Sequence, residues 1–243
     1  MNKILKFFEI KFRFLFTKSI VRGHKKSKIY IGKNVTIENS KIVIFENSTL
    51  HIDDNTVIKN VNMKIKGKVD IGKYNIIDNG YLSSKIFITI NGSFSMGDFN
   101  RIRCAIWSRF DSILSIGCHN NINEETEIRA DERVVIGDYN QISYKCLIWD
   151  TNTHNIYPDS KRRDLTNNFY PIFGYEFEKP STKPVSIAND CWIGREVAIL
   201  KGVEIKNSCV IGYRTTLSNC IIDKNKVVVS KSNNVIHDRT NND

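Results

Sequence analysis

Residues 187–217 read IANDCWIGREVAILKGVEIKNSCVIGYRTTL, and an aliphatic residue recurs at every sixth position of this stretch. A second set of mostly small or medium side chains follows each of these residues by four positions. The first set is Ile187, Ile193, Ile199, Ile205, Ile211 and Leu217, and the second set is Cys191, Val197, Val203, Cys209, Thr215 and Ile221. A period of six matches neither the 3.6-residue period of a helix nor the alternation of a simple strand. It predicts a triangular parallel β-solenoid, in which each short strand points one aliphatic side chain inwards and three hexads form one coil.

The same phase continues upstream with wider spacing. The markers are Ile31-Gly32, Ile52-Asp53, Ile71-Gly72, Met96-Gly97, Ile116-Gly117 and Ile136-Gly137, in line with Ile193-Gly194 and Ile211-Gly212. Most spacings exceed three hexads, and the segments from Met96 to Ile116 and from Ile116 to Ile136 divide as six, six and eight, which indicates one enlarged corner per coil. We therefore predict one solenoid of roughly eight to nine coils over residues 29–229, followed by a polar tail at 230–243.

The hexads stop between Ile148 and Ile187. All four prolines of the chain lie in this interval. We predict a loop at residues 149–186 that is extruded from the regular scaffold, and such long loops are usually functional or disordered. His154 lies near the start of this loop, in the stretch IWDTNTHNIYPDSKRRD at residues 148–164.

The net charge of +10 is concentrated at the N-terminus. Residues 1–28 carry nine basic residues and one acidic residue, so the rest of the chain is close to neutral, and a nucleic-acid-binding face is not indicated. The apolar residues Leu5, Phe8, Phe12, Leu15 and Phe16 share one helical face, which predicts a basic amphipathic helix on an anionic membrane surface. Two alternatives stay open: a helix that packs over the end of the main domain, and a strand, since Phe12, Phe14 and Phe16 also alternate. No stretch of this segment is long enough to span a bilayer and no signal peptide is evident, so we expect a cytoplasmic protein with peripheral contact at the inner face of the membrane.

The cysteines and histidines do not indicate a metal site. The six cysteines form no CxxC pair and have no histidine at zinc spacing, so we interpret them as reduced, small apolar side chains. The five histidines are too dispersed to predict a site in which three of them converge, and we predict no metal.

The stretch SIANDCWIGREVAILKGVEIKNSCVIG, residues 186–212, resembles the hexapeptide-repeat acyltransferases. Within them it is similar to the O-acetyltransferases that modify bacterial capsule, lipopolysaccharide and other surface sugars. The resemblance covers most of residues 29–229 and rests on a histidine after an acidic or amide residue in the extruded loop, then x-WIG, then ILKGV at hexad phase. It implies an all-β, left-handed parallel β-helix that forms homotrimers. It also implies that acetyl-CoA lies in a groove between neighbouring prisms, with the catalytic histidine exposed there.

The resemblance assigns the chemistry to His154. A sugar hydroxyl is a poor nucleophile at neutral pH, so acyl transfer to it needs a base, and imidazole is the usual one. Asp150 and Asn152 are close enough in sequence to orient the imidazole, and either could equally cap the turn. Backbone N–H groups of the facing coil are the expected donors to the oxyanion.

The predicted contacts to acetyl-CoA lie downstream of the loop, at Trp192, Gly194, Lys201, Gly202, Gly212, Tyr213 and Arg214. Each has a simpler interpretation: a surface aromatic for the tryptophan, a turn for the glycines, and solvated surface charge for the basic residues. Two positions depart from the family pattern. Tyr213-Arg214-Thr215 replaces a small A-G-S turn, and Glu125 stands where some sugar-acetylating relatives have asparagine.

The function predicted from these features is transfer of acetyl from acetyl-CoA to a hydroxyl of a bacterial cell-surface glycan, which we expect to be capsule, O-antigen or a sialic-acid-like sugar. The main enzymatic alternative is an N-acetyltransferase of a nucleotide-linked amino sugar, which shares the fold and the donor. A non-enzymatic binding solenoid would keep the hexads but has no need of an extruded histidine loop. Binding of CoA distinguishes both enzymes from this last class.

Overall fold

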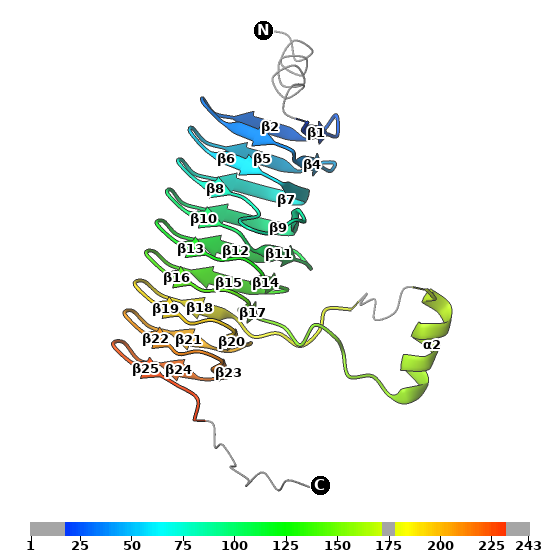
Figure 1. Cartoon of the computed structure of the whole chain (residues 1–243). Helices are drawn as coiled ribbons and strands as arrows, with labels where there is room; N and C mark the ends of the chain where they lie inside the picture. Colours follow the sequence, from blue (N-terminus) through cyan, green and yellow to red (C-terminus); the bar gives the residue numbers. More distant parts are fainter. Residues whose placement is uncertain (1–17, 172–177, 232–243) are drawn as a thin grey trace, which may run out of the picture.

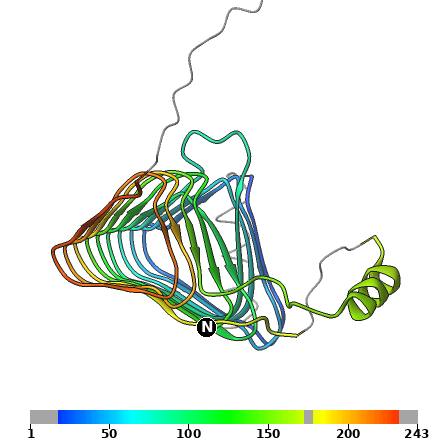
Figure 2. The same ribbon diagram turned by 90° about the horizontal axis from the view of Figure 1, so that it is seen from below.

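The computed structural model describes residues 18–171 and 178–231 of the chain. These residues form a parallel β-solenoid with a triangular cross-section, which Figures 1 and 2 show from the side and along its axis. Each coil contributes strands to three walls. Nine strands form one wall, one from each coil, as the sequence period predicts.

The strands form two hydrogen-bonded sheets. The nine-stranded sheet contains β3 (Thr36–Glu38), β6 (Val57–Lys59), β8 (Ile76–Ile77), β10 (Arg101–Ile102), β13 (Asn121–Ile122), β16 (Gln141–Ile142), β19 (Trp192–Ile193), β22 (Val210–Ile211) and β25 (Val227–Val228). The sixteen-stranded sheet forms the other two walls with β1 (Ile20–Gly23), β2 (Lys28–Ile31), β4 (Lys41–Ile44), β5 (Thr49–Ile52), β7 (Val61–Ile71), β9 (Ile86–Met96), β11 (Ala105–Ser108), β12 (Ser112–Ile116), β14 (Glu127–Ala130), β15 (Arg133–Ile136), β17 (Leu147–Trp149), β18 (Val185–Ile187), β20 (Ala198–Ile199), β21 (Glu204–Ile205), β23 (Thr216–Leu217) and β24 (Ile221–Ile222).

The three corners of the prism have different chemistry, and we name them by their residues. The loop corner joins the two walls of the sixteen-stranded sheet, where residues 150–184 leave between β17 and β18. The Tyr144 corner lies between the nine-stranded sheet and the wall that starts at β1. The glycine corner, which contains Gly97 and Gly117, precedes the nine-stranded sheet. Figure 2 shows one loop protruding between β8 and β9 and another, with helix α2 (Asp159–Phe169), leaving a different corner.

Successive coils approach one another closely at the glycine corner. A Cβ added at Gly97 would lie 2.9 Å from the carbonyl oxygen of Gly117, so no larger residue fits without a shift. Inside this corner Asn100 and Asn120 are buried and hydrogen-bonded, with Asn120 Nδ2 donating to Asn100 Oδ1 at 3.0 Å. Stacked glycines and asparagines therefore satisfy the corner's polar groups while keeping the coils in register.

The residues at hexad phase fill the prism. The first set from Ile187 to Leu217 is buried throughout, with between 0% and 7% of the surface of each residue exposed. Each such isoleucine stacks on the equivalent residue of the next coil, for example Ile193 on Ile211. Full burial of an aliphatic side chain contributes about 1.5–3 kcal/mol, and the continuous column gives every coil an apolar partner above and below.

Three features differ from the regular pattern. The solenoid begins at Ile20, upstream of residue 29, because β1 already pairs with β4. After Leu217 the phase slips by one residue, so that Ile222 pairs with Ile205 while Ile221 is 63% exposed. The extruded loop contains helix α2, which the hexad search did not anticipate because the helix has no apolar face: none of its eleven residues is buried.

The predicted amphipathic segment falls mostly outside the described residues, since only residues from 18 onward are described. Within residues 18–171 and 178–231, no helix has the length and the apolar character needed to cross a membrane. All six cysteines are free thiols, four buried and two half-buried, which agrees with their predicted role as small apolar side chains.

Candidate functional site

The extruded loop leaves the prism through a root in which its two ends pair. Thr151 and Thr182 form an isolated antiparallel bridge. The N–H of Asn152 donates to the carbonyl of Ser181 at 3.0 Å, and the N–H of Lys183 donates to the carbonyl of Asp150 at 2.9 Å. The chain is thus held on both sides shortly before it reaches His154.

Asp150 is fully buried at this root, and its carboxylate caps the corner of the preceding coil. Its Oδ1 accepts from the N–H of Asp131 at 2.8 Å, and its Oδ2 accepts from the N–H groups of Glu132 at 2.8 Å and Arg133 at 2.6 Å. Burial raises the pKa of Asp150, although the three N–H donors oppose that rise. The capping alternative is therefore present in the structure, and an orienting role for Asp150 toward His154 stays a prediction.

A buried ion pair fixes the residue immediately before His154. The carboxylate of Asp131 is fully buried and accepts two hydrogen bonds from Arg109, from Nε at 2.8 Å and from Nη2 at 2.6 Å. The same Nη2 donates to the carbonyl of Thr153 at 3.3 Å. Thr153 has a positive φ of 65°, and its N–H donates to Thr151 Oγ1 at 3.0 Å. Arg109 thus connects the rigid prism to the turn that carries His154.

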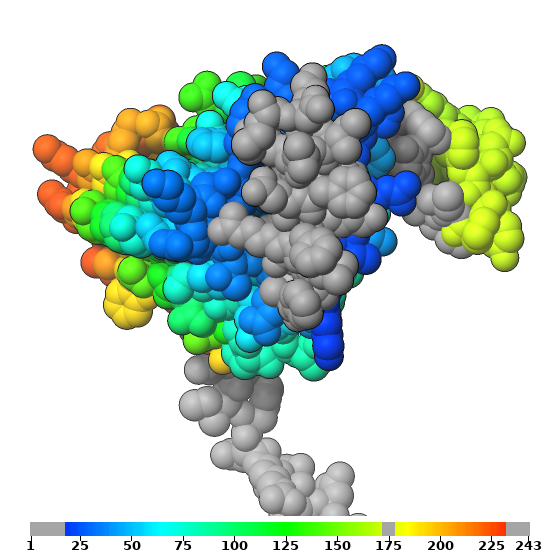
Figure 3. All heavy atoms as spheres, turned by 90° about the horizontal axis from the view of Figure 1, so that it is seen from above, coloured from blue at the N-terminus to red at the C-terminus, as the bar shows by residue number. Residues whose placement is uncertain are grey.

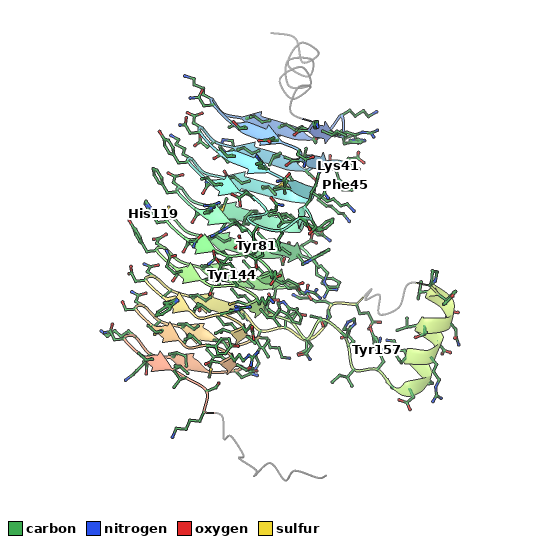
Figure 4. The ribbon with its side chains drawn as sticks, viewed as in Figure 1. Lys41, Phe45, Tyr81, His119, Tyr144 and Tyr157 are labelled. Atoms are coloured by element: carbon green, nitrogen blue, oxygen red, sulfur yellow. The ribbon has the colours of Figure 1, made fainter. Side chains whose placement is uncertain are left out.

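His154 itself is exposed, and the loop beyond it is tied to helix α2. The hydroxyl of Tyr157 donates to Glu178 Oε2 at 3.1 Å, and Lys161 Nζ lies 3.1 Å from Glu178 Oε1 and 4.1 Å from the centre of the Tyr157 ring. Figure 3 shows α2 at one side of the molecule, and Figure 4 shows Tyr157 on the segment between this helix and the prism.

Two of the predicted acetyl-CoA contacts lie beside this root. Gly202 has a φ of +76°, and its N–H is shared between the carbonyls of Lys183 and Pro184, 3.2 Å from each. The neighbouring Lys201 donates from Nζ to Ser181 Oγ at 3.0 Å. The loop corner therefore brings Lys201 and Gly202 together with Asp150, Asn152 and the turn before His154.

The other predicted contacts lie away from the loop corner. Gly194, Gly212, Tyr213 and Arg214 are at the Tyr144 corner, where Arg214 Nε pairs with Glu196 Oε2 at 2.6 Å. This contact lowers the pKa of Glu196 and raises that of Arg214. Trp192 stands on the nine-stranded sheet between Gln141 and Val210 and is 59% exposed. One chain alone does not place these residues next to His154.

No protein-family model and no curated protein sequence matches this chain. Among solved structures, the polySia-specific acetyltransferase NeuO aligns over 92% of this chain and 90% of its own length, with a TM-score of 0.54 and 16% identity. The chain is a left-handed parallel β-helix. Two further structures align at lower TM-scores. The polysialic acid O-acetyltransferase OatWY has a TM-score of 0.41, 19% identity and coverage of 91% and 92% of the two chains. The Arabidopsis UDP-N-acetylglucosamine acyltransferase has a TM-score of 0.41, 16% identity and coverage of 88% and 70%.

This β-helix agrees with the fold that the hexads and the resemblance predicted. The residues that sequence reasoning missed are Arg109 and Asp131, which occupy the loop corner in two consecutive coils. Their signal was available, because Arg109 and Asp131 follow equivalent strands, β11 and β14, which pair in parallel. A basic and an acidic residue at the same corner of neighbouring coils predict an ion pair along the axis. That Arg109 also contacts Thr153, the residue before His154, could not be predicted without knowing the path of the loop.

Proposed function

We propose that this β-helix is an acyltransferase that transfers an acetyl group from acetyl-CoA to a hydroxyl of a bacterial cell-surface glycan, with His154 as the general base. The observation that carries the proposal is the Arg109 contact to Thr153, which ties the turn before His154 to a buried carboxylate of the prism. An exposed loop histidine without a role has no need of such an anchor. The fold shared with a polySia-specific acetyltransferase supports the same reaction class.

The transfer consists of one addition and one elimination. The imidazole of His154 removes the proton of the acceptor hydroxyl as its oxygen adds to the acetyl carbonyl carbon. The tetrahedral adduct then collapses with cleavage of the C–S bond, which releases the CoA thiolate and leaves the acetyl ester on the sugar. The imidazolium returns its proton to the thiolate or to water. No acyl-enzyme is required, and the most buried cysteine thiols are poor nucleophiles: burial raises the pKa of Cys104 to about 12.

The chain offers two groups of residues for acetyl-CoA, which is a substrate here. Gly202 at the loop corner and Gly212 at the Tyr144 corner lack a Cβ, so a pantetheine arm can approach the backbone at either place. Lys201 and Arg214 supply positive charge for the phosphates of CoA. Because these groups occupy different corners, a single groove that uses both requires a neighbouring prism. We therefore propose a homotrimer with the donor bound between subunits.

The test is release of CoA thiol from acetyl-CoA with a panel of bacterial glycans, free sugars and nucleotide-linked amino sugars. Wild type is compared with His154→Ala and with His119→Ala, a matched control in which an exposed histidine at the glycine corner is removed. Loss of a general base lowers the rate by about a hundredfold to ten-thousandfold. We expect that loss for His154→Ala only. Turnover that survives in His154→Ala contradicts the mechanism, and turnover with amines alone indicates the N-acetyltransferase instead.

A further inference from the structure

The Tyr144 corner contains a cavity that the proposed transfer does not use. Its volume is about 540 Å³, within the range of ligand sites in proteins. One side is the loop between β8 and β9, and the other is formed by the coils of β10, β13 and β16. The residues that matter for its chemistry are Asn79, Tyr81, Arg101, Arg103, Glu124 and Tyr144. Figure 4 shows Tyr81 and Tyr144 on the same side of the solenoid, far from the loop with Tyr157.

The loop that forms one side of the cavity is fixed by hydrogen bonds. Asn60 Nδ2 donates to Asn79 Oδ1 at 2.7 Å, and Asn79 Nδ2 donates to the carbonyls of Leu82 and Ser84. Gly80 has a φ of +53° and lies so close to Glu124 that a Cβ there would overlap the carboxylate. The cavity is therefore preformed, which lowers the entropy cost of binding.

Two buried polar atoms of residues that line the cavity lack hydrogen-bond partners among the described residues. Glu124 is 1% exposed; its Oε1 accepts from Arg103 Nη1 at 3.0 Å and from the N–H of Tyr81 at 3.3 Å, while its Oε2 accepts nothing. Arg103 uses Nη2 for Asn121 and Asn123, while its Nε–H donates to nothing. An unsatisfied buried donor and an unsatisfied buried acceptor both cost free energy, so each needs a partner.

The pair of orphaned atoms selects the kind of ligand. A hydroxyl accepts one hydrogen bond and donates another, so vicinal hydroxyls of a sugar complement Arg103 Nε and Glu124 Oε2 together. An anionic group would place its charge beside the free oxygen of Glu124, and an ammonium group would place its charge beside Arg103. The second arginine is already paired, since Arg101 Nη2 lies 3.1 Å from Asp78 Oδ2. The remaining cation of the lining, Lys59, pairs with Glu38 at 3.1 Å, so the charge around the cavity is largely balanced, which favours a neutral polyhydroxylated ligand.

The two tyrosines supply the remaining surface that a sugar ring needs. Their ring centres are 6.0 Å apart, with an interplanar angle of 37°. Tyr81 is 63% exposed, so its ring is accessible to a ligand that enters the cavity. The C–H faces of a pyranose pack against aromatic rings, while its hydroxyls point to the polar groups. We propose that this cavity is a binding site for a neutral sugar unit, held by Arg103 and Glu124 and packed against Tyr81 and Tyr144.

This binding site does not depend on acetyl transfer. Within one chain the loop with His154 leaves the prism at another corner, and none of the cavity residues is among those proposed for the transfer or for acetyl-CoA. Sugar binding at the cavity can therefore be measured without acetyl-CoA. It can be present if the chain transfers no acetyl group, and absent if it does.

The experiment is saturation-transfer NMR on the full chain, with glucose, galactose and N-acetylglucosamine as neutral probes and glucuronic acid as the acidic probe. The variants are Tyr81→Ala and Glu124→Gln, which keeps the volume of the side chain but replaces a carboxylate oxygen with a donor. His154→Ala reports on the candidate active site, and Tyr139→Ala is the control for removal of an exposed tyrosine elsewhere, since Tyr139 is 57% exposed at the glycine corner.

We expect at least one neutral probe to bind, with its affinity reduced at least tenfold in Tyr81→Ala and in Glu124→Gln and unchanged in His154→Ala and Tyr139→Ala. Circular dichroism and the thermal midpoint establish that each variant is folded. The proposal is overturned if the neutral probes do not bind at millimolar concentration, which would mean that water alone satisfies the two orphaned atoms. It is also overturned if glucuronic acid binds more tightly than the neutral probes, or if the two cavity variants bind as wild type does.

Discussion

Replacement of Arg109 by methionine separates the stability of the loop corner from its role in positioning His154. Arg109 is the hydrogen-bonding partner of the fully buried Asp131 carboxylate, and the backbone N–H of Asp131 donates to the buried carboxylate of Asp150. The negative charge of Asp131 also contributes to the raised pKa of Asp150, and Arg109 supplies the positive charge beside Asp131. Methionine keeps most of the length of the arginine stem and removes the charge.

The magnitude follows from the burial of the partners. Loss of one member of a buried ion pair costs about 3–5 kcal/mol, because the other charge is left unpaired. The side chain of Arg109 is 29% exposed, so water can reach part of the site and we expect the lower end, about 3 kcal/mol. Asp131→Asn removes the buried charge instead, and we expect it to cost about 1–2 kcal/mol. The double variant should be no less stable than Arg109→Met, which gives a coupling energy of at least about 1 kcal/mol.

Urea denaturation followed by circular dichroism measures the free energy of unfolding of the four proteins in this cycle. Lys145→Met is the control, since Lys145 pairs with Glu125 at 3.2 Å on the surface and such pairs contribute at most about 1 kcal/mol. The same proteins are assayed for acetyl transfer, where release of the Thr153 carbonyl should lower kcat by about tenfold to a hundredfold. A loss of stability no larger than that of the control, or an unchanged kcat in Arg109→Met, refutes the assignment of Arg109 as a positioning residue.

The remaining predictions concern protonation, thiol reactivity and the N-terminus. Burial raises the pKa of Asp150 above its ordinary value of 3.8, so the folded state holds this proton more tightly than the unfolded state. The resulting contribution to stability is fully present below pH 3.8 and is lost as the pH rises through the folded-state pKa. The free energy of unfolding in urea, measured against pH, should show this loss in wild type and not in Asp150→Asn. Cys104, with a pKa of about 12, should resist a thiol reagent at pH 8 in the folded protein while the half-buried Cys118 and Cys220 react, as mass spectrometry of labelled peptides can determine. Deletion of residues 1–17, which spares β1, should leave transfer to a soluble acceptor unchanged and abolish cosedimentation with anionic vesicles; a fall in the thermal midpoint would instead support a capping role.

The hexad phase predicted the core residues because the narrow cross-section of the prism determines which side chains point inwards. Each coil must place one side chain per wall inside a narrow prism, so the position of Ile187 also determines those of Ile193 and Ile199. The six-residue period no longer predicts the inward residues where a corner gains or loses a residue. The length of a corner depends on the local turn, which the period does not describe. The last coil is one case: the strict period places Asp223 inside the prism, and because the interior cannot accommodate a charged residue, Ile222 pairs with Ile205 instead.

The candidate site was less predictable than the core, because its contacts join distant parts of the chain. His154 could be singled out by its place in a loop that interrupts the repeat. The contact of Arg109 with Thr153 spans 44 residues and depends on how the loop leaves the prism. The cavity at the Tyr144 corner depends in the same way on the β8–β9 loop, where Tyr81 meets Glu124 across 43 residues. Periodicity aligns equivalent positions of neighbouring coils, and it contains no information about the segments between them.

The predicted acetyl-CoA contacts lie at two corners of the prism, so a site that uses both needs two neighbouring subunits. Mixing variants of the two corners tests this arrangement. Helix α2 extends from the loop corner and buries none of its residues, although an isolated helix of its length is marginal in water. A neighbouring prism would cover this arm and would bring its own Tyr144 corner, with Tyr213 and Arg214, toward His154.

In a trimer with shared sites, His154→Ala and the double variant Tyr213→Ala/Arg214→Ala damage opposite sides of the same groove. When the two are unfolded and refolded together at equal concentration, about one quarter of the random interfaces carry both intact sides, so transfer should recover to about one quarter of wild type. If each site lies within a single chain, the mixture has only the summed activity of the two variants, and the homotrimeric groove proposed for acetyl-CoA is wrong.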